Sequence, residues 1–290
     1  METEKLAHIH SAAGTPLTRR SFLAASALGL VALQRRHPVT IGVQSYSFRD
    51  RSLADAIAGM QKVGLHSCEL WQSHVEPRGI SREEMRKWRE TIGLDHFHRV
   101  HDQFAKAKIS LSAYNISFRD DFSDAEIERG FEMAAALGAP AITASSNVKT
   151  TARIAPVATR RKMKVGVHNH SRIDPNEFAT TKSLTDALQA GPFIAVNLDI
   201  GHFTAANEDA VAFLQQHHTR IVTLHIKDRR RNQGDNVPFG EGDTPITKVL
   251  NLLQQNGWPI PANIEYEYKG GDTVDEVAKC VAYCRKALNL

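Results

Sequence analysis

The sequence predicts an α/β fold, a (β/α)8 TIM barrel in which eight parallel strands alternate with helices. Three observations support this prediction: short β-rich runs alternate with amphipathic runs from Pro38 onward, the chain has 290 residues, and its hydrophobic content of 42% allows a large core. Because such barrels take roughly 250 residues, we expect a leader of residues 1–37 followed by one barrel domain of residues 38–290.

The expected strands are short runs rich in apolar and β-branched residues. Between them, apolar residues recur at helical spacing, and several of these runs open with Ser, Asp or Asn and close with Gly, as helices do. An open doubly wound sheet is the alternative, but it needs a glycine-rich turn after the first strand, and residues 45–53 contain no glycine. The strands are expected at residues 41–48, 67–72, 110–118, 141–147, 164–170, 194–203, 221–228 and 262–268.

The N-terminal leader has the order of an export signal. Arg19 and Arg20 precede an apolar run over residues 22–33 that is too short to span a bilayer. Residues 18–23, Thr-Arg-Arg-Ser-Phe-Leu, look like a twin-arginine signal of bacterial proteins exported in the folded state, which predicts a periplasmic location. Because no clean A-x-A site lies near Leu33, cleavage and retention as an anchor both stay open, and an uncleaved leader would be the expected route of membrane contact.

Charge and cysteine content exclude some classes of protein. The formal net charge is +4, and basic residues do not gather in runs interleaved with aromatic residues, so binding to nucleic acid is not predicted. The three cysteines cannot form a disulfide framework. Cys280 and Cys284 fall four apart in a helical pattern, where we expect them to pack as small apolar residues.

Ionisable side chains gather at the C-terminal ends of four consecutive strands. Side chains two apart on a strand share a face, and the C-terminal ends of barrel strands carry the active site. Carboxylates aimed at one cavity repel each other unless a cation lies between them. The pattern therefore predicts a divalent metal ion among His168 or His170 on the fifth strand, Asp199 on the sixth, His225 on the seventh, and Glu265 or Glu267 on the eighth.

The expected donors suit some metals better than others. Two nitrogen and two oxygen ligands favour Mn²⁺, Co²⁺, Fe²⁺ or Zn²⁺ over Ca²⁺ or Mg²⁺. His202 lies three residues after Asp199, where it could orient the substrate or transfer a proton. His170, Lys227 and Asp228 are candidates for the same neighbourhood.

These motifs resemble the xylose isomerase-like sugar phosphate isomerase/epimerase superfamily. Its members are TIM barrels that hold one divalent cation with ligands from strands five to eight and move protons next to a sugar carbonyl through a metal-stabilised enediolate. The resemblance implies the ligands His168, Asp199, His225 and Glu265, with Glu267 as the alternative to Glu265. The motifs that carry it are CELWQSHVEP (68–77), VHNH (167–170), NLDIGHF (197–203), LHIKDR (224–229), FGEGDTP (239–245) and IEYEY (264–268).

The expected ligand on the fifth strand differs from the one found in the ketose 3-epimerase branch of this superfamily. In the ketose 3-epimerases this ligand is a Glu that doubles as a base, whereas this sequence has His168. The His-Asn-His form is more similar to inosose dehydratases and to lyases acting on 3-keto sugars. The resemblance therefore implies an isomerase or epimerase, or alternatively a keto-sugar or keto-glycoside lyase or dehydratase. In either case Glu265 or a nearby His would remove the proton next to the carbonyl.

Other residues are expected to bind the substrate. Glu69, Trp71 and His74 would line a sugar pocket, and Arg229 resembles a substrate-contacting Arg of relatives. The polar, glycine-rich loop 229–245 could close over the substrate. No glycine-rich turn with basic support opens a helix, so we expect an unphosphorylated sugar or glycoside rather than a sugar phosphate.

Two other classes of function are compatible with a barrel of this kind. A non-catalytic sugar-binding or partner subunit is one, although four strands with intact ligands favour an enzyme. A barrel that cuts DNA at abasic sites is the other, and it would need a three-metal cluster and a basic groove. Assembly as a homo-oligomer is compatible with the sequence, which does not name the substrate.

Overall fold

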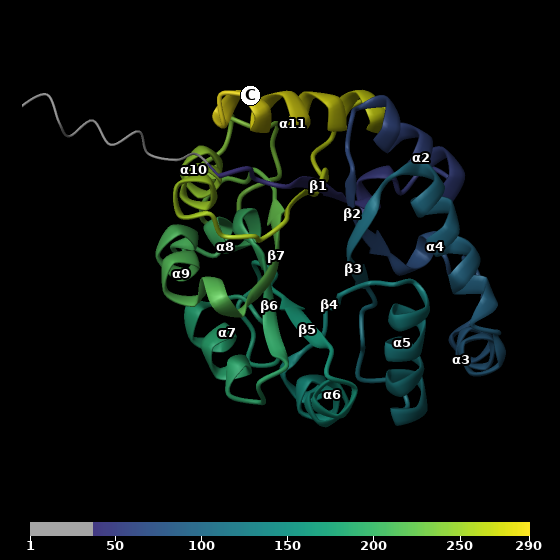
Figure 1. Ribbon diagram of the computed structural model, residues 1–290. Coiled ribbons are helices and arrows are strands. Elements are labelled where there is room, and N and C mark those ends of the chain that lie inside the picture. Colours follow the sequence, from purple (N-terminus) through teal and green to yellow (C-terminus); the bar gives the residue numbers. More distant parts are fainter. Residues whose placement is uncertain (1–36) are drawn as a thin grey trace, which may run out of the picture. The chain divides into compact units, whose positions relative to one another are not determined.

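Eight parallel strands form a closed barrel in the order β1 to β8, and helices surround it (Figure 1). The computed structural model describes residues 37–290, so the predicted leader and its twin-arginine pattern lie outside the described residues. The prediction of a (β/α)8 barrel is confirmed. The strands are β1 (Ile41–Gln44), β2 (Ser67–Trp71), β3 (Ser110–Asn115), β4 (Ala141–Ala144), β5 (Lys164–His168), β6 (Ile194–Asp199), β7 (Ile221–Ile226) and β8 (Ala262–Ile264).

Every strand begins at the predicted residue and ends earlier than predicted. After β1, β2 and β6, the residues that extended the pattern belong to short helical turns, in which Phe48 and Phe203 are buried. After the other strands they are loop residues. Gln44 and Asp199 end their strands because their side chains accept hydrogen bonds from backbone amides of the turns that follow. The turns change the direction of the chain at the C-terminal mouth of the barrel.

The helices follow the capping signals of the sequence. Ser52, Ser81, Ser123 and Asn147 each accept a hydrogen bond from an amide in the first turn of the helix they open. The α-helices are α2 (Leu53–Lys62), α3 (Arg82–Thr91), α4 (Asp95–Ala107), α5 (Asp124–Ala136), α6 (Val148–Arg161), α7 (Thr181–Leu188), α8 (Ile200–Ala205), α9 (Ala210–His217), α10 (Ile246–Asn256) and α11 (Thr273–Ala287). Short 3₁₀ turns are η1 (Ser45–Phe48), η2 (Gln72–His74) and η3 (His218–Arg220).

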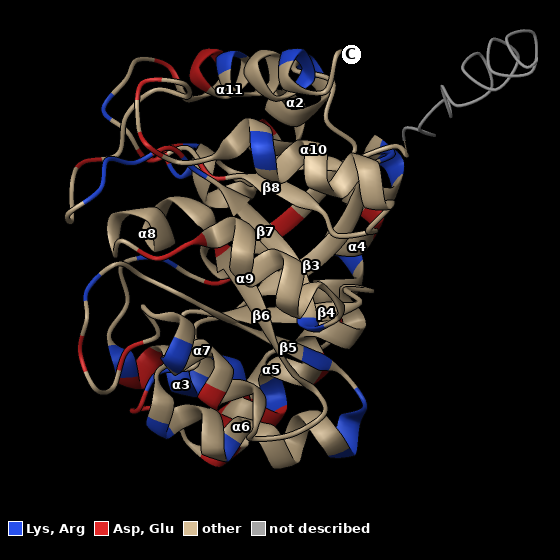
Figure 2. Cartoon of the chain, turned by 90° about the vertical axis from the view of Figure 1, so that its left-hand side faces the viewer, with Lys and Arg blue, Asp and Glu red and all other residues tan. Residues whose placement is uncertain are grey.

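The core lies between the strands and the inner faces of the helices. Charged residues gather on helices and loops, and most of the strand ribbon carries none (Figure 2). Cys280 and Cys284 are buried in this core, so their predicted apolar packing is confirmed. Inside the barrel, Gly42 is required because a Cβ there would lie 2.3 Å from Oδ1 of Asn263. Within residues 37–290, no helix is long and apolar enough to cross a membrane.

A buried ion-pair network joins α3 to α5. Arg89 donates to both carboxylate oxygens of Glu76, at 2.9 and 2.7 Å, and lies 3.4 Å from Oε1 of Glu126. Arg82 donates to Oε2 of Glu126 at 2.6 Å. Because Glu76 and Glu126 are buried, loss of one partner would leave a charge without compensation in the interior.

We predict that Glu126→Gln destabilises the protein in a pH-dependent way. Burial tends to raise the pKa of Glu126, but hydrogen bonds from Arg82 and from the Ser123 amide lower it below its ordinary value. A carboxylate with a depressed pKa stabilises the fold above its ordinary pKa and loses this effect as the pH falls through the folded value. We expect the free energy of unfolding to fall by about 1–3 kcal/mol at neutral pH.

Urea unfolding of wild type and variant at neutral pH and at about pH 3 measures this effect. The difference in unfolding free energy should shrink at the lower pH, because the carboxyl group of the unfolded chain is protonated there and the contribution of the depressed pKa declines. Glu83→Gln, at an exposed position of α3, is the control and should have little effect. A difference that is equal at both pH values would contradict the assignment.

Candidate active site

A cavity of about 380 Å³ opens at the C-terminal ends of the strands. This is the end at which barrels of this class carry their functional groups. One wall comes from strands β5 to β8 and their loops, with His168, His170, His202, His225, Glu265 and Glu267. The other wall comes from β1 to β4 and their loops, with Gln44, Tyr46, Trp71, Asn115, Ser117, Arg119 and Ser145.

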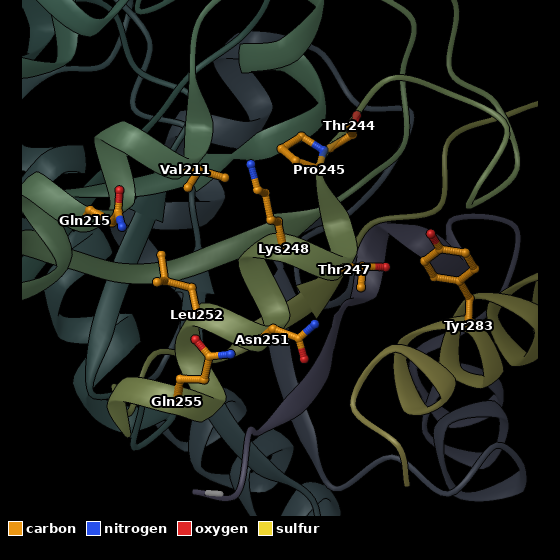
Figure 3. A pocket seen from close by; sticks show the side chains of 10 residues that line it. All are labelled: Val211, Gln215, Thr244, Pro245, Thr247, Lys248, Asn251, Leu252, Gln255 and Tyr283. Carbon is orange, nitrogen blue, oxygen red and sulfur yellow. The ribbon is translucent and has the colours of Figure 1, made fainter. Parts of the chain in front are cut away.

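A larger hollow of about 540 Å³ lies elsewhere, among residues of α9, α10 and α11 (Figure 3). Most of the described side chains that line it are aliphatic, amide or hydroxyl groups, and the one charged side chain among them is that of Lys248. None of these described side chains is an imidazole, a carboxylate or a thiol. The barrel mouth is therefore the better candidate for catalysis, although its cavity is smaller.

Four side chains at the floor of the mouth cavity form a candidate metal centre. His168, Asp199, His225 and Glu265 are all buried, and one donor atom from each lies within 4.8 Å of the others. The register explains this, because Asp199 of β6 pairs directly with His225 of β7. The set combines two imidazoles with two carboxylates, which are the donors that Mn²⁺, Co²⁺, Fe²⁺ and Zn²⁺ take in proteins.

The carboxylates of this centre have charged partners. Oδ2 of Asp199 and Oε2 of Glu265 contact the Lys227 ammonium group, and Oε2 of Glu265 also lies 3.0 Å from Nδ1 of His225. Nδ1 of His168 has no hydrogen-bond partner among the described residues. Buried polar atoms are normally satisfied, so the free nitrogen of His168 beside two buried carboxylates points to a missing partner. A divalent cation would accept the lone pair of His168 and offset the carboxylate charges, so the residues present fit a metal ion.

Lys227 brings a positive charge to the edge of this centre. Its ammonium group is buried and lies 2.9 Å from Oδ2 of Asp199, 2.8 Å from Oε2 of Glu265 and 2.6 Å from Oε2 of Glu267. Desolvation tends to lower the pKa of Lys227, but these carboxylates raise it above its ordinary value. Lys227 is therefore charged and offsets part of the negative charge of the site.

The pKa shifts of the donors have different causes. Burial lowers the pKa of His168 well below 6.5, so this imidazole is neutral and keeps a lone pair for a cation. Burial raises the pKa of Asp199 to about 6, although Lys227 acts in the opposite direction. Burial alone would lower the pKa of His225, but Glu265 and Glu69 raise it well above its ordinary value. The raised pKa means that His225 holds a proton, which a metal ion would have to displace.

Glu69 lies beneath the candidate metal centre rather than in the cavity wall, where the sequence placed it. Its side chain is fully buried. The carboxylate accepts hydrogen bonds from Nε2 of His225 at 2.9 Å and from Oγ1 of Thr143 at 2.6 Å. Amide groups of Gln44, Asn197 and Asn263 donate to it at 3.2, 3.3 and 3.1 Å. Glu69 therefore holds His225 with Nδ1 directed at the centre.

The other expected substrate-binding residues have different environments. Trp71 lines the cavity and makes an edge-on contact with Tyr46, with ring centroids 4.9 Å apart. His74 is buried behind Trp71, and its ring nitrogens lie 2.9 Å from Oγ of Ser45 and 3.3 Å from the Phe48 carbonyl oxygen. This position supports Trp71 and leaves His74 outside the cavity lining.

Arg229 also lies outside the cavity lining, behind His202. Its guanidinium donates to the carbonyl oxygen of Gly234 at 2.7 Å, to Oγ of Ser171 at 2.9 Å and to Nδ1 of His202 at 2.7 Å. The structure thus makes Arg229 a support for His202 and for the loop after β5, where the sequence analysis expected a substrate contact.

Two histidines remain in the cavity wall. His202 is nearly buried, and Nζ of Lys227 lies 3.0 Å from its Nε2. His170 is partly exposed, and its Nδ1 lies 3.6 Å from Oε2 of Glu177. The ring centroids of the two histidines are 5.6 Å apart. Both can therefore reach a molecule that occupies the cavity.

Asp228 organises the long loop after β7. Its carboxylate accepts hydrogen bonds from the backbone amides of Gly240, Gly242 and Thr244 at 2.7, 3.1 and 3.2 Å. Arg229 and Asn236 form an isolated antiparallel bridge within the same loop. Asp228 thus has a structural role next to the site, and closure of loop 229–245 over a substrate stays a prediction.

Several cavity residues were missed by the sequence analysis. They end or follow strands β1, β3 and β4, where the rule applied to the last four strands would have found them. These strand ends carry mostly neutral side chains and no recognisable motif. The missed residues are Gln44, Tyr46, Asn115, Ser117, Arg119 and Ser145.

A family model described as the xylose isomerase-like TIM barrel matches residues 57–286. The chain belongs to this family. It is thereby a sugar isomerase/epimerase-family TIM barrel, as the motifs at the strand ends had indicated.

One curated relative matches part of this xylose isomerase-like chain. It is the L-ribulose-5-phosphate 3-epimerase UlaE of Escherichia coli, with 35% identity over 89 residues. The match covers 30% of this chain and 31% of the relative. The chain thus aligns with less than a third of the length of this relative.

Two solved structures share the fold over most of their length. The apo form of the 3-keto-D-glucoside 4-epimerase YcjR from E. coli has a TM-score of 0.65 and 13% identity, covering 86% of this chain and 100% of that one. The probable 3-DHS dehydratase AsbF from Bacillus anthracis has a TM-score of 0.63 and 16% identity, covering 84% and 99%. At these identities the similarity shows the fold.

We predict that Glu69→Gln destabilises the floor of the site. All five partners of the carboxylate act as donors, and a Gln amide would place its own NH₂ group against one of them. A buried donor without an acceptor costs about 1–3 kcal/mol, which urea unfolding detects. Thr143→Val is the comparison, because it removes one donor and leaves the other four in place. A loss no larger than that of Thr143→Val would contradict the role given to Glu69.

Proposed function

We propose that this protein is a divalent-metal-dependent enzyme that abstracts a proton next to the carbonyl of a sugar, as isomerases and epimerases do. The observation that carries the proposal is the buried cluster of two imidazoles and two carboxylates at the floor of a polar cavity, whose donor atoms lie within 4.8 Å of one another. The partial similarity to an L-ribulose-5-phosphate 3-epimerase and the fold shared with a 3-keto-D-glucoside 4-epimerase support a sugar substrate.

The metal would be held by His168, Asp199, His225 and Glu265. We favour Mn²⁺, Co²⁺, Zn²⁺ or Fe²⁺ over Mg²⁺ because two of the donors are imidazole nitrogens. When bound, the ion would polarise the sugar carbonyl and offset the negative charge that develops on its oxygen.

Residues around the centre would perform the proton transfer. Glu265 removes the proton from the carbon next to the carbonyl, because its carboxylate lies at the junction of cavity and centre. The buried Lys227 ammonium, 2.8 Å from that carboxylate and outside the cavity lining, positions Glu265 for this step. His202 and His170 line the same cavity, where either can deliver a proton to the product. Trp71 and Tyr46 form an apolar surface against which the sugar ring packs.

Elimination from a keto sugar or keto-glycoside is the second candidate reaction. His168 favours it, because a neutral imidazole stands where epimerases with two opposed carboxylates need a base. In this reaction Glu265 removes the same proton, and His170 protonates the leaving oxygen on the neighbouring carbon. The probable dehydratase AsbF, which shares the fold, supports this alternative.

We predict that the purified protein binds one divalent metal ion per chain. Asp199→Asn and His225→Ala each remove a proposed metal ligand. Loss of a residue that only supports a ligand lowers metal affinity roughly 10–100-fold, so these two changes should lower it by more. The measurement is the metal content by mass spectrometry after loading with Mn²⁺, Co²⁺ or Zn²⁺ and gel filtration. Glu177→Gln, a change near His170 but outside the four donors, should leave the content unchanged. Equal metal content in all three variants would contradict the site.

We predict that the metal-loaded protein exchanges the proton next to a sugar carbonyl with solvent. A panel of ketoses and 3-keto-glucosides in D₂O, followed by NMR, would detect deuterium at that carbon. An epimer or isomer indicates the first reaction, and an unsaturated ketone indicates elimination. Glu265→Gln should slow the exchange by about 10²–10⁴-fold. Metal-loaded protein that incorporates no deuterium into any of these sugars would refute the proposed function.

A further inference from the structure

The two walls of the mouth cavity differ in charge. The wall from β5 to β8 carries the carboxylates of Glu265 and Glu267 above Asp199. The described residues on the wall from β1 to β4 are neutral, except for Arg119. A molecule that reaches both walls therefore meets the candidate metal centre at one end and a guanidinium group at the other.

The Arg119 side chain is exposed and belongs to the lining of the cavity. The hydrogen bond that Arg119 forms within residues 37–290 is made by its backbone carbonyl oxygen. Neighbouring arginines of the barrel mouth are engaged: Arg49 donates to the Tyr266 carbonyl oxygen at 2.8 Å, and Arg78 donates to that of Ser73 at 2.7 Å. An arginine that lines a cavity with free donors is available to a ligand.

The backbone around Arg119 is held from several sides. The amide of Ser117 donates to Oε1 of Gln72 at 2.7 Å, and the Phe122 amide donates to the Arg119 carbonyl oxygen at 3.0 Å. Phe118, between Ser117 and Arg119, is fully buried and stacks on Phe131 with ring centroids 6.0 Å apart. The loop therefore fixes the backbone from which the Arg119 side chain contributes to the cavity lining.

Two hydroxyl groups share this wall. The side chains of Ser117 and Ser145 line the cavity, and neither hydroxyl forms a hydrogen bond within the described part of the chain. A guanidinium fork with nearby hydroxyl donors matches the oxygens of a carboxylate or phosphate group. An anionic group would pair with the charge of Arg119, which neutral sugar hydroxyls do not do.

We propose that Arg119, with Ser117 and Ser145, binds an anionic substituent of the sugar at the end remote from the reacting carbonyl. The shared chemistry is that of a carboxylate or a phosphate. This inference rests on the proposed function for the orientation of the sugar, because the carbonyl end is the one assigned to the metal centre. It makes the substrate class an acidic sugar rather than a neutral one.

Binding of three probes to the metal-loaded protein tests the inference. Calorimetry with D-glucuronate, D-glucose 6-phosphate and D-glucose should show that at least one anionic sugar binds roughly ten- to a hundredfold more tightly than glucose. The stronger of the two anionic probes identifies the group. Arg119→Gln should remove this preference. Arg172→Gln removes an exposed arginine that pairs with Asp174 outside the cavity lining, and it should keep the preference.

Several results would overturn the inference. These are equal binding of the three sugars by the wild type, binding of none of them, or a preference that survives Arg119→Gln. Circular dichroism verifies that the variant is folded. Deuterium exchange with a neutral keto sugar separates this test from that of the proposed function. Exchange without an anion preference refutes only the role of Arg119, whereas a preference without exchange supports that role and refutes the proposed reaction.

Discussion

The structure depends on one electrostatic constraint, the burial of two carboxylates at the ends of neighbouring barrel strands. Asp199 and Glu265 are removed from water at the floor of the cavity, where ionised groups are costly without a counter-charge. Lys227 contacts both carboxylates, yet Nδ1 of the neighbouring His168 lacks a hydrogen bond among the described residues. A divalent cation would join these groups, and the proposed chemistry follows from its position.

The barrel interior below this point is built to hold the imidazole of His225. A second buried carboxylate, that of Glu69, accepts its Nε2 hydrogen, and side chains from other strands complete the environment of Glu69. Gly42 leaves the space that the Asn263 amide occupies. A polar layer across the closed sheet thus orients a ligand whose own strand could not fix it, as carboxylates do for metal-bound histidines in general.

The sequence predicted the strands and four of the side chains at the site because both depend on local patterns. Alternation along a strand assigns His225 and Glu265 to the inner face, and the strand ends set their depth. The role of Glu69 could not be predicted in the same way, since its partners come from five other strands and depend on the register of the closed barrel. Arg119 follows its strand in an irregular loop without a motif, so its place in the cavity emerged from the fold.

Anomalous scattering from crystals of the Co²⁺- or Zn²⁺-loaded protein would test the central claim most directly. We expect one peak per chain, about 2.0–2.2 Å from Nδ1 of His168, Oδ2 of Asp199, Nδ1 of His225 and Oε2 of Glu265. A fully loaded crystal in which the peak lies elsewhere, or contacts fewer than three of these atoms, would contradict the account.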